Sequence, residues 1–435
     1  MKPFYDPSQL RTLRRKPGVI HPSFGDLNRL TAVAIPEPMY PQSAYCEQPF
    51  GFVHLSVTER CNARCEGCIN ALSFSGDSFN NQRKNHFSDV VPERDAEAIL
   101  QLLPGMQEKD VVICLYGGEP LMAIDKIERL YRILSTKELP FNLRFMVYTN
   151  GQLLREAIER HGDLMSYIWL FSLSIDGRET QHNKIRVGTD LASIHKNLRL
   201  LKDVRKGPLL MWSTLRDGQS LFDCFEEFLE LKENGFADHF FWHWVETRKP
   251  FQNYAAYIAK YEEDLRRIMD NYVHTLSRGE ALSIIHINEL ILYLLTGKKR
   301  GTTGCGVEVE RNFDIVGGKI YACADLPLSE PIGHIEDNGT PHFKPYNLSL
   351  FTTYKSDLGC YECGVHNYCG GRCPVQALAS EAEGLIQYCQ LIRVHVGVVM
   401  DYIPQISELL AAHSITLQDL YDCSAVFAQF TDVTP

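Results

Sequence analysis

The sequence predicts an α/β fold: a partial parallel barrel of six βα units, followed by a cysteine-rich region and a helical tail. From Gly51 to about residue 245, short β-rich runs alternate with amphipathic helical segments, which is the pattern of parallel strands joined by crossover helices. Beyond residue 300, the chain changes to short loops rich in cysteine. A doubly wound open sheet has the same local pattern, so periodicity alone leaves that second architecture open.

Six runs are expected to form the barrel strands, because each is dense in β-branched, aromatic and other apolar residues. They span residues 52–58, 111–116, 143–149, 167–175, 209–215 and 239–245. We expect the aromatic residues of the sixth run to fill the barrel rather than to form a substrate cage. Helices are expected between the strands, at 94–103, 124–134, 191–203 and 221–235. The last of them ends in a glycine, which is common directly after a helix.

The chain is expected to divide into four segments. The first is proline-rich with little apolar periodicity, which predicts an extended arm. The second holds the barrel and, around 251–295, bridging helices; the third holds most of the cysteines, and the fourth is a helical tail. Their boundaries are 1–50, 51–300, 301–390 and 391–435.

Composition and charge exclude some partners. Lys and Arg total 44 against 54 for Asp and Glu, a net charge of −10, which argues against a general nucleic-acid-binding surface because such binding depends on clustered cations. The longest apolar runs are shorter than the roughly 20 residues that span a bilayer, and the first residues have no apolar signal region. We expect a cytoplasmic protein with neither nucleic acid nor membrane as a partner.

Three of the fourteen cysteines stand close together after the first predicted strand, at the spacing C-x3-C-x2-C: Cys61, Cys65 and Cys68. Disulfides are a poor explanation, because cytosolic thiols are kept reduced and a chain of this length does not need them. Metal clusters normally take four protein ligands, so a triplet leaves one coordination position open for chemistry. A zinc knuckle or a redox triplet is the alternative.

Polar motifs accompany the second and the fourth predicted strands. After the second strand comes Gly117-Gly118-Glu119-Pro120, where two glycines allow close backbone approach and a carboxylate suits an ammonium ion; an ordinary turn is the alternative. After the fourth strand, Ser174 offers a hydroxyl and Arg186 a fork for a carboxylate. Both also fit an ordinary loop role.

Seven further cysteines follow the barrel in the pattern C-x12-G-x4-C, then C-x2-C-x5-C-x3-C, then a last cysteine. They are Cys305, Cys323, Cys360, Cys363, Cys369, Cys373 and Cys389. Two zinc ribbons are the alternative reading of this spacing. Of the cysteines outside both sets, Cys114 and Cys224 are expected to be small buried apolar residues.

The triplet and the Gly-Gly-Glu-Pro motif resemble those of radical S-adenosylmethionine (SAM) enzymes. The second cysteine set resembles the SPASM domain that is appended to radical SAM peptide-modifying enzymes. The resemblance implies a [4Fe–4S] cluster on the triplet, with SAM on its open iron and the Gly-Gly-Glu-Pro motif at the SAM amino group. Ser174, toward the SAM ribose or carboxylate, and Arg186, as a carboxylate fork, are the further candidates for binding the cofactor. It also implies two auxiliary [4Fe–4S] clusters, one on Cys305, Cys323 and Cys373 and the other on Cys360, Cys363, Cys369 and Cys389.

The first auxiliary cluster has only three assigned ligands. A carboxylate, water, the substrate or a leftover cysteine such as Cys46 could complete it. In some relatives an Asp beside the second ligand acts as a base, which makes Asp325 a candidate catalytic residue; the extra Ala324 departs from that placement.

The resemblance implies an enzyme that forms a 5′-deoxyadenosyl radical and oxidises a ribosomally made precursor peptide, with a side-chain macrocycle such as a cyclophane as the specific prediction. A flavodoxin- or ferredoxin-type protein is the expected electron donor. The segment before the barrel is too short for a winged-helix leader-binding module, so the barrel, the tail or the basic arm would bind a leader. The alternatives are an anaerobic sulfatase-maturating enzyme and, in another class, a non-catalytic iron–sulfur electron carrier.

Overall fold

The computed structural model describes residues 32–69, 89–103, 110–246, 249–309, 313–325 and 331–431. Most of the predicted extended arm, with its basic run, lies outside the described residues. So does most of the loop that follows the cysteine triplet.

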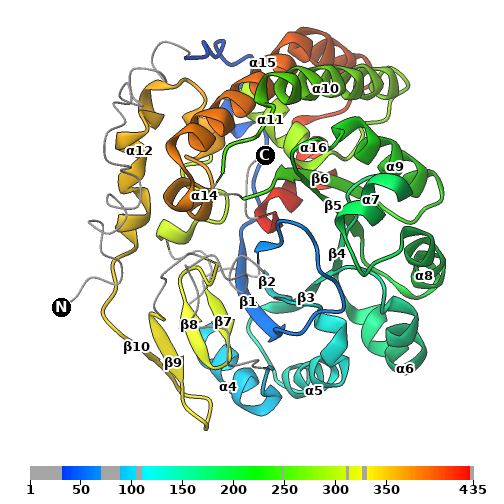
Figure 1. Cartoon of the computed structure of the whole chain (residues 1–435), viewed down its shortest axis with the longest axis vertical. Helices are drawn as coiled ribbons and strands as arrows, with labels where there is room; N and C mark the ends of the chain where they lie inside the picture. Colours follow the sequence, from blue (N-terminus) through cyan, green and yellow to red (C-terminus); the bar gives the residue numbers. More distant parts are fainter. Residues whose placement is uncertain are drawn as a thin grey trace.

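Six parallel strands form the predicted barrel wall (Figure 1). Each strand is hydrogen-bonded to the next one along the chain, and no other strand lies between them. A doubly wound sheet reverses its strand order at a switch point, so the partial barrel is confirmed and the open alternative is excluded. The strands are β1 (Phe50–Thr58), β2 (Asp110–Gly117), β3 (Asn142–Thr149), β4 (Leu170–Ser174), β5 (Leu209–Leu215) and β6 (His239–Trp244).

The fourth predicted strand, 167–175, is too long at its start. Tyr167 is the last residue of a helix, and the Ile168 backbone N–H still donates to the Leu164 carbonyl, 3.3 Å away. The aromatic and apolar residues there looked β-rich, but Leu164 and Met165 are buried on the inner face of that helix. The strand therefore begins only at Leu170.

Helices cover the outside of the barrel wall (Figure 1). The helix predicted at 221–235 ends as expected, because Gly235 adopts a left-handed φ of +68° directly after the Asn234 cap. The wall helices are α4 (Pro92–Leu102), α5 (Ile124–Ser135), α6 (Leu154–Tyr167), α7 (Glu179–Ile185), α8 (Leu191–Val204) and α9 (Leu221–Glu233). A short 3-10 helix, η3 (Pro120–Ala123), precedes α5.

The bridging and tail segments are helical. The stretch predicted around 251–295 forms two helices, α10 (Tyr254–Leu276) and α11 (Ile285–Thr296), and α10 packs along the long helix α15 (Ala382–Ala412). Because α15 contains Cys389 and continues past residue 390 without a break, the tail and the cysteine-rich region share one helix. Helix α16 (Leu417–Cys423) and the 3-10 helix η7 (Ala425–Phe430) follow.

Helix η7 closes the amino-terminal end of the barrel. The Phe430 ring packs against Phe50 at the start of β1, with 5.1 Å between ring centroids, and against Trp169 just before β4, also at 5.1 Å. The Phe427 ring lies 4.1 Å from the His239 ring at the start of β6. The chain end thus fills the barrel opening opposite the carboxyl ends of the strands.

The cysteine-rich region extends the barrel sheet instead of standing apart from it. Strand β7 (Asp314–Val316) pairs in parallel with β1, and antiparallel β8 (Lys319–Tyr321), β9 (Gly333–Ile335) and β10 (Pro341–Phe343) continue outward. The remaining elements are short: η1 (Gln42–Ala44), η4 (Val307–Val309), η5 (Leu348–Thr352), α12 (Thr353–Asp357), η6 (Cys360–Glu362), α13 (His366–Cys369) and α14 (Pro374–Ala379). No helix in the described part of the chain is both long and apolar enough to cross a membrane.

Candidate functional site

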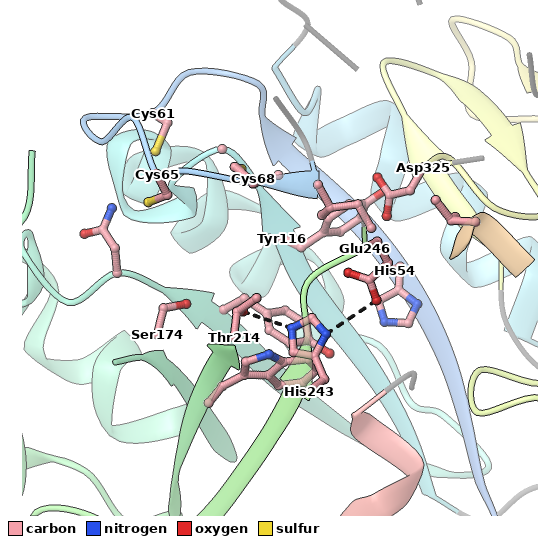
Figure 2. Close-up of a pocket in the computed structure, with 18 of the residues that line it drawn as sticks. His54, Cys61, Cys65, Cys68, Tyr116, Ser174, Thr214, His243, Glu246 and Asp325 are labelled. Atoms are coloured by element: carbon pink, nitrogen blue, oxygen red, sulfur yellow. Dashed lines mark hydrogen bonds and ion pairs between the residues drawn. The ribbon is translucent and has the colours of Figure 1, made fainter. Parts of the chain in front are cut away.

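A cavity of about 300 Å³, called the central cavity below, lies at the carboxyl ends of the barrel strands. Each of the six parallel strands contributes to its wall, through His54, Tyr116, Tyr148, Ser174, Trp212 and His243. Most of the sequence-predicted site residues also line it, namely Cys61, Cys65, Cys68, Gly117, Gly118, Glu119, Ser174, Arg186, Cys305, Cys323, Asp325 and Cys373. Figure 2 shows the triplet on one side of the cavity and Asp325, with Glu246 and His54, on the other.

The triplet loop is held by backbone hydrogen bonds from its own residues. The Arg64 N–H donates to the Val187 carbonyl at 2.7 Å, and the Glu66 N–H donates to the Ile185 carbonyl at 3.1 Å. Gly67, between the second and third cysteines, has a φ of +63°, and a Cβ there would lie 2.7 Å from a Val245 methyl. Only glycine fits this turn without strain, so local geometry fixes the spacing of the three thiols.

Burial changes the acidity of the triplet thiols. It raises the pKa of Cys61 to about 11. It also raises the pKa of Cys65, although the nearby Arg186 guanidinium acts in the opposite direction. Thiolate, not thiol, binds metal, so loading a cluster here must release protons.

The two glycines of the Gly-Gly-Glu-Pro motif allow the triplet loop to approach β2. A Cβ on Gly117 would lie 2.3 Å from the Thr58 carbonyl oxygen, and a Cβ on Gly118 would lie 2.1 Å from the Arg60 carbonyl oxygen. The N–H groups of Gly118 and Glu119 donate to these same two carbonyls, each at 2.8 Å. We predicted close approach to a ligand; the closest approach is to the loop that carries the triplet.

Glu119 is buried and its carboxylate has several protein partners. It accepts hydrogen bonds from the Thr149 hydroxyl at 2.8 Å, from the Asn150 N–H at 2.8 Å and from the Leu121 N–H at 3.1 Å. Burial nevertheless dominates and raises the pKa of Glu119 to about 7. The carboxylate therefore ties the end of β2 to the end of β3, and a role toward the SAM amino group stays a prediction. Pro120 starts η3 and does not line the cavity.

The Arg186 fork is already engaged by a carboxylate of the chain. Its Nε donates to Asp176 Oδ2 at 2.7 Å and its Nη2 to Oδ1 at 3.0 Å, while Nη1 of Arg216 donates to the same Oδ2 at 2.7 Å. Burial alone would raise the pKa of Asp176, but the two guanidinium groups hold it well below its usual range. Arg216 also donates from Nε to the Glu66 carbonyl of the triplet loop, so this pair of arginines supports the loop.

A second polar group lines the cavity on the side of β5 and β6. The Thr214 hydroxyl shares a hydrogen bond of 2.9 Å with His243 Nε2, and His243 Nδ1 lies 3.4 Å from Glu246 Oε1 (Figure 2). Burial would raise the pKa of Glu246, but His243 and Arg372 lower it. Glu246 is thus a buried, ionised carboxylate at the cavity wall. Ser174, at the end of β4, faces the same space.

The second cysteine set separates into two places in the structure. Cys305, Cys323 and Cys373 line the central cavity. The other four line a small separate cavity of about 20 Å³, called the second pocket below: Cys360, Cys363, Cys369 and Cys389. This is the same division that the family resemblance implied for the two auxiliary clusters.

The cysteines outside both sets take no part in these sites. Cys114 and Cys224 are buried in the apolar core, as predicted. Cys46 is exposed, and its backbone N–H donates to Gln418 Oε1 at 2.7 Å; it lines neither cavity. Cys46 is therefore no candidate for the fourth ligand of the first auxiliary cluster.

The donor chemistry fits sulfur-bound clusters. Ten thiols in groups of three, three and four face the two cavities, and thiolates are the usual ligands of iron–sulfur clusters. Among the described residues, no group of three or more His, Cys, Asp or Glu is arranged to hold a single metal ion. The assignment of these cysteines to clusters remains a prediction from their spacing.

Sequence reasoning missed several cavity residues. Arg216 lines the cavity directly after β5, and Asp176, shortly after β4, is the buried partner of Arg186 and Arg216; a charged residue just after a buried strand was an available signal. His243 lies in the aromatic run that was expected to fill the barrel, and Glu246 directly follows it; both line the cavity. Of the aromatic residues, Phe241 packs against Trp212 of β5, with 4.7 Å between ring centroids, whereas Trp242 faces the helices and donates to the Tyr261 hydroxyl of α10 at 3.3 Å. For Thr431, beyond η7, no sequence signal pointed to the cavity that it lines.

Comparisons with known proteins agree with this arrangement. Residues 55–247 match the family model of the radical SAM superfamily. The solved structure of native anSMEcpe with bound AdoMet matches with a TM-score of 0.61 at 18% identity, covering 84% of this chain and 100% of that chain. The complex of native anSMEcpe with AdoMet and the Cp18Cys peptide gives 0.60 at 18%, covering 83% and 99%.

Streptococcus suis SuiB bound to precursor peptide SuiA matches with a TM-score of 0.45 at 16% identity, covering 78% of this chain and 76% of that chain. The anSMEcpe matches show that the two proteins share a fold. The family match covers the barrel from β1 to the end of β6, where the triplet, the glycine pair and the central cavity lie. Residues 55–247 are therefore a radical SAM domain, and the chain that contains this domain is an enzyme.

Proposed function

We propose that the chain is a radical SAM/SPASM maturase that installs an oxidative side-chain cross-link, such as a cyclophane, in a ribosomally made precursor peptide. The observation that supports this most is that the triplet and Cys305, Cys323 and Cys373 line one cavity. When bound, SAM and the clusters would supply a 5′-deoxyadenosyl radical and an acceptor for the electron that the substrate loses.

The residues of the chain would bind and shield these groups. The triplet would hold the SAM cluster, with Gly117, Gly118 and Ser174 beside SAM; the loop bonds of Arg216 and the Asp176–Arg186 pair would keep the triplet in place. Tyr116, Tyr148 and Trp212 line the cavity and would exclude water around the reacting carbon. Asp325 lines the same cavity and remains the candidate to accept the proton of the oxidised substrate.

A peptide substrate is supported by the shared fold. One anSMEcpe structure holds the Cp18Cys peptide together with AdoMet, and this chain, which shares the fold, has a cavity at the carboxyl ends of its barrel strands. A precursor peptide and a flavodoxin- or ferredoxin-type electron donor are accordingly the proposed partners. A non-catalytic electron carrier is no longer an alternative, because the chain contains a radical SAM domain.

Sulfatase maturation is the second candidate function. It is favoured by the fold similarity to anSMEcpe, which extends over the whole length of that chain. The two functions differ in their product: a cross-link removes two hydrogens from the peptide, whereas sulfatase maturation converts a Cys or Ser into formylglycine. Mass spectrometry with an aldehyde-reactive probe separates these outcomes.

The proposed function is tested on the anaerobically reconstituted full-length protein. We expect close to three [4Fe–4S] clusters by iron and sulfide analysis, reductive cleavage of SAM to 5′-deoxyadenosine, and a loss of two hydrogens in the peptide encoded beside this gene. Replacing Cys61, Cys65 and Cys68 together by Ala should remove one cluster and all SAM cleavage. About one cluster in the parent protein, stoichiometric zinc, or 5′-deoxyadenosine from the triple variant would contradict the assignment.

A further inference from the structure

The two groups of SPASM-type cysteines lie in opposite charge surroundings. The first group, Cys305, Cys323 and Cys373, lines the central cavity together with the carboxylates of Glu246, Asp314 and Asp325. The other carboxylate and guanidinium groups of this cavity lie on the side of the triplet loop: Glu119, Arg186 and Arg216. The Ala324 N–H, directly after Cys323, donates to Asp314 Oδ2, and Asp325 is two residues from the same cysteine. The surroundings of the first group are therefore acidic.

The second group has cationic surroundings. Two guanidinium groups, those of Arg372 and Arg393, line the second pocket beside the four cysteines, and no carboxylate is among the described residues that line it. Both arginines are mostly buried, at 3% and 9% exposure. Arg372 directly precedes Cys373 and also acts on Glu246 at the first group, whereas Arg393 stands only beside the cysteines of the second pocket.

A buried ion pair between the two groups has its negative member toward the first group and its positive member toward the second. Glu308 and Lys355 are 3.2 Å apart, with side-chain exposures of 8% and 6%. The carboxylate of Glu308 accepts from the Thr303 hydroxyl, which lies 3.8 Å from Cys305 Sγ in the first group. Lys355 lies toward the second group, since a Cβ on Gly371, which lines the second pocket, would lie 2.8 Å from Lys355 Cε.

The backbone of Arg372 adopts a strained conformation. Its φ is +70°, in a run of left-handed residues after Gly370 and Gly371, and a non-glycine residue is strained there. The guanidinium is held over the Tyr388 ring at 4.8 Å and over the Trp244 ring at 5.7 Å from the centroids. A cation fixed over two buried rings keeps its charge at this place.

Buried charges act strongly because little water screens them, and the reduction potential of an iron–sulfur cluster depends on the charge around it. Carboxylates near a cluster disfavour its reduction, and cations favour it. We propose that Glu246, Asp314 and Asp325 lower the potential of the cluster held by the first group, while Arg372, Arg393 and Lys355 raise that of the second, so that the second lies above the first. This inference rests on the two auxiliary clusters of the proposed function.

This order of potentials means that one electron moves from the first cluster to the second. The cluster at the central cavity, once it has taken the electron lost by the substrate, is oxidised again as the cluster of the second pocket is reduced, and no bond or proton needs to change. The six charged side chains act only by setting the potentials of the clusters. In this role they do not touch the substrate, so they are not catalytic residues.

The test is a potentiometric titration of the reconstituted full-length protein, followed by electron paramagnetic resonance. Signals are assigned with Cys323→Ala for the first cluster and Cys389→Ala for the second. We expect the second cluster to be reduced at the higher potential. In Arg393→Gln its midpoint should fall while the first midpoint stays, and Arg393→Lys, which keeps the charge, should restore most of the shift. Arg132→Gln, at an exposed pair on α5, is the matched control and should change neither.

A second variant tests the acidic side. Glu246→Gln, which removes one negative charge with little change in shape, should raise the midpoint of the first cluster alone. The inference is overturned if the second midpoint lies below the first in the parent protein, or if neither charge variant shifts its cluster. Iron analysis separates these results from a failure of the proposed function: about one cluster in the parent protein contradicts the auxiliary sites themselves, whereas three clusters with the reverse order contradict only this inference.

Discussion

Arg186 binds both carboxylate oxygens of Asp176, with Nε at 2.7 Å from Oδ2 and Nη2 at 3.0 Å from Oδ1. Asp176 is fully buried, and Nη1 of Arg216 donates to Oδ2 of the same carboxylate. The two arginines connect Asp176 to the triplet loop. Arg216 donates to the Glu66 carbonyl of that loop, and Arg186 directly follows Ile185, whose carbonyl accepts from the Glu66 N–H.

Asp176→Asn should therefore destabilise the protein strongly. The change leaves two buried guanidinium groups without their shared negative charge, and breaking a buried ion pair costs about 3–5 kcal/mol. Urea unfolding of the protein without clusters measures this loss. Arg132→Gln, which breaks an exposed pair with Glu128, should cost no more than about 0.5 kcal/mol. Equal effects from the two variants would show that the Asp176 pair contributes no more than a surface pair.

Gly118→Ala should displace the triplet loop. A Cβ at this position would lie 2.1 Å from the Arg60 carbonyl oxygen, so the loop must move, at an expected cost of about 1–3 kcal/mol. We expect the variant to bind less iron at the triplet and to cleave SAM more slowly. Gly397→Ala is the control, because a Cβ there meets nothing within 4 Å and alanine favours a helix. Normal cluster content in Gly118→Ala would contradict the packing role of the glycine.

The stability of the protein without clusters should depend on pH through Glu119. Burial raises its folded pKa to about 7 from an ordinary value of 4.5, so the folded state binds the proton more tightly than the unfolded state. This contribution is fully present below about pH 4.5 and is lost as pH rises to about 7, a change of roughly 3 kcal/mol.

Glu119→Gln should remove that contribution, because glutamine does not titrate in this range. The unfolding free energy of the parent protein, compared with that of Glu119→Gln, should fall by most of this amount between pH 5 and 8. A constant difference across the range would mean that Glu119 keeps an ordinary pKa in the folded protein.

Cys373→Ala should uncouple SAM cleavage from product formation. The residue lines the central cavity with Cys305 and Cys323, whereas the triplet lies in a loop on the barrel more than 300 residues earlier. With the cognate peptide present, we expect 5′-deoxyadenosine to accumulate while the product that lacks two hydrogens falls sharply. Undiminished product from a variant shown to lack this cluster would mean that the electron leaves by another route.

Much of the fold could be predicted from the sequence because its signals are local. The alternation of apolar runs and amphipathic helices predicted the βα units, and five of the six strands begin and end within two residues of the prediction. The run at 167–175 failed because Tyr167 and its neighbours are apolar enough for either state, and a backbone hydrogen bond from Ile168 to Leu164 decided for the helix.

The sequence by itself also determined the cysteine groups. Spacings such as C-x3-C-x2-C bring thiols together within one loop, so they are legible without knowledge of the rest of the chain, and the second set divided between two cavities as the resemblance implied. The glycine pair was recognised as well, although its neighbour proved to be the Arg60 carbonyl of the triplet loop.

Only the tertiary structure decided which distant side chains meet. Asp176 and Arg216 are 40 residues apart and Tyr148 and Phe430 are 282 apart, and no local period encodes such pairs. They form because neighbouring strands end at one edge of the barrel and because η7 packs into its opposite end. The same packing places Glu246 at the first cysteine group and Arg393 at the second; buried charges depend on three-dimensional surroundings, which composition and spacing do not contain.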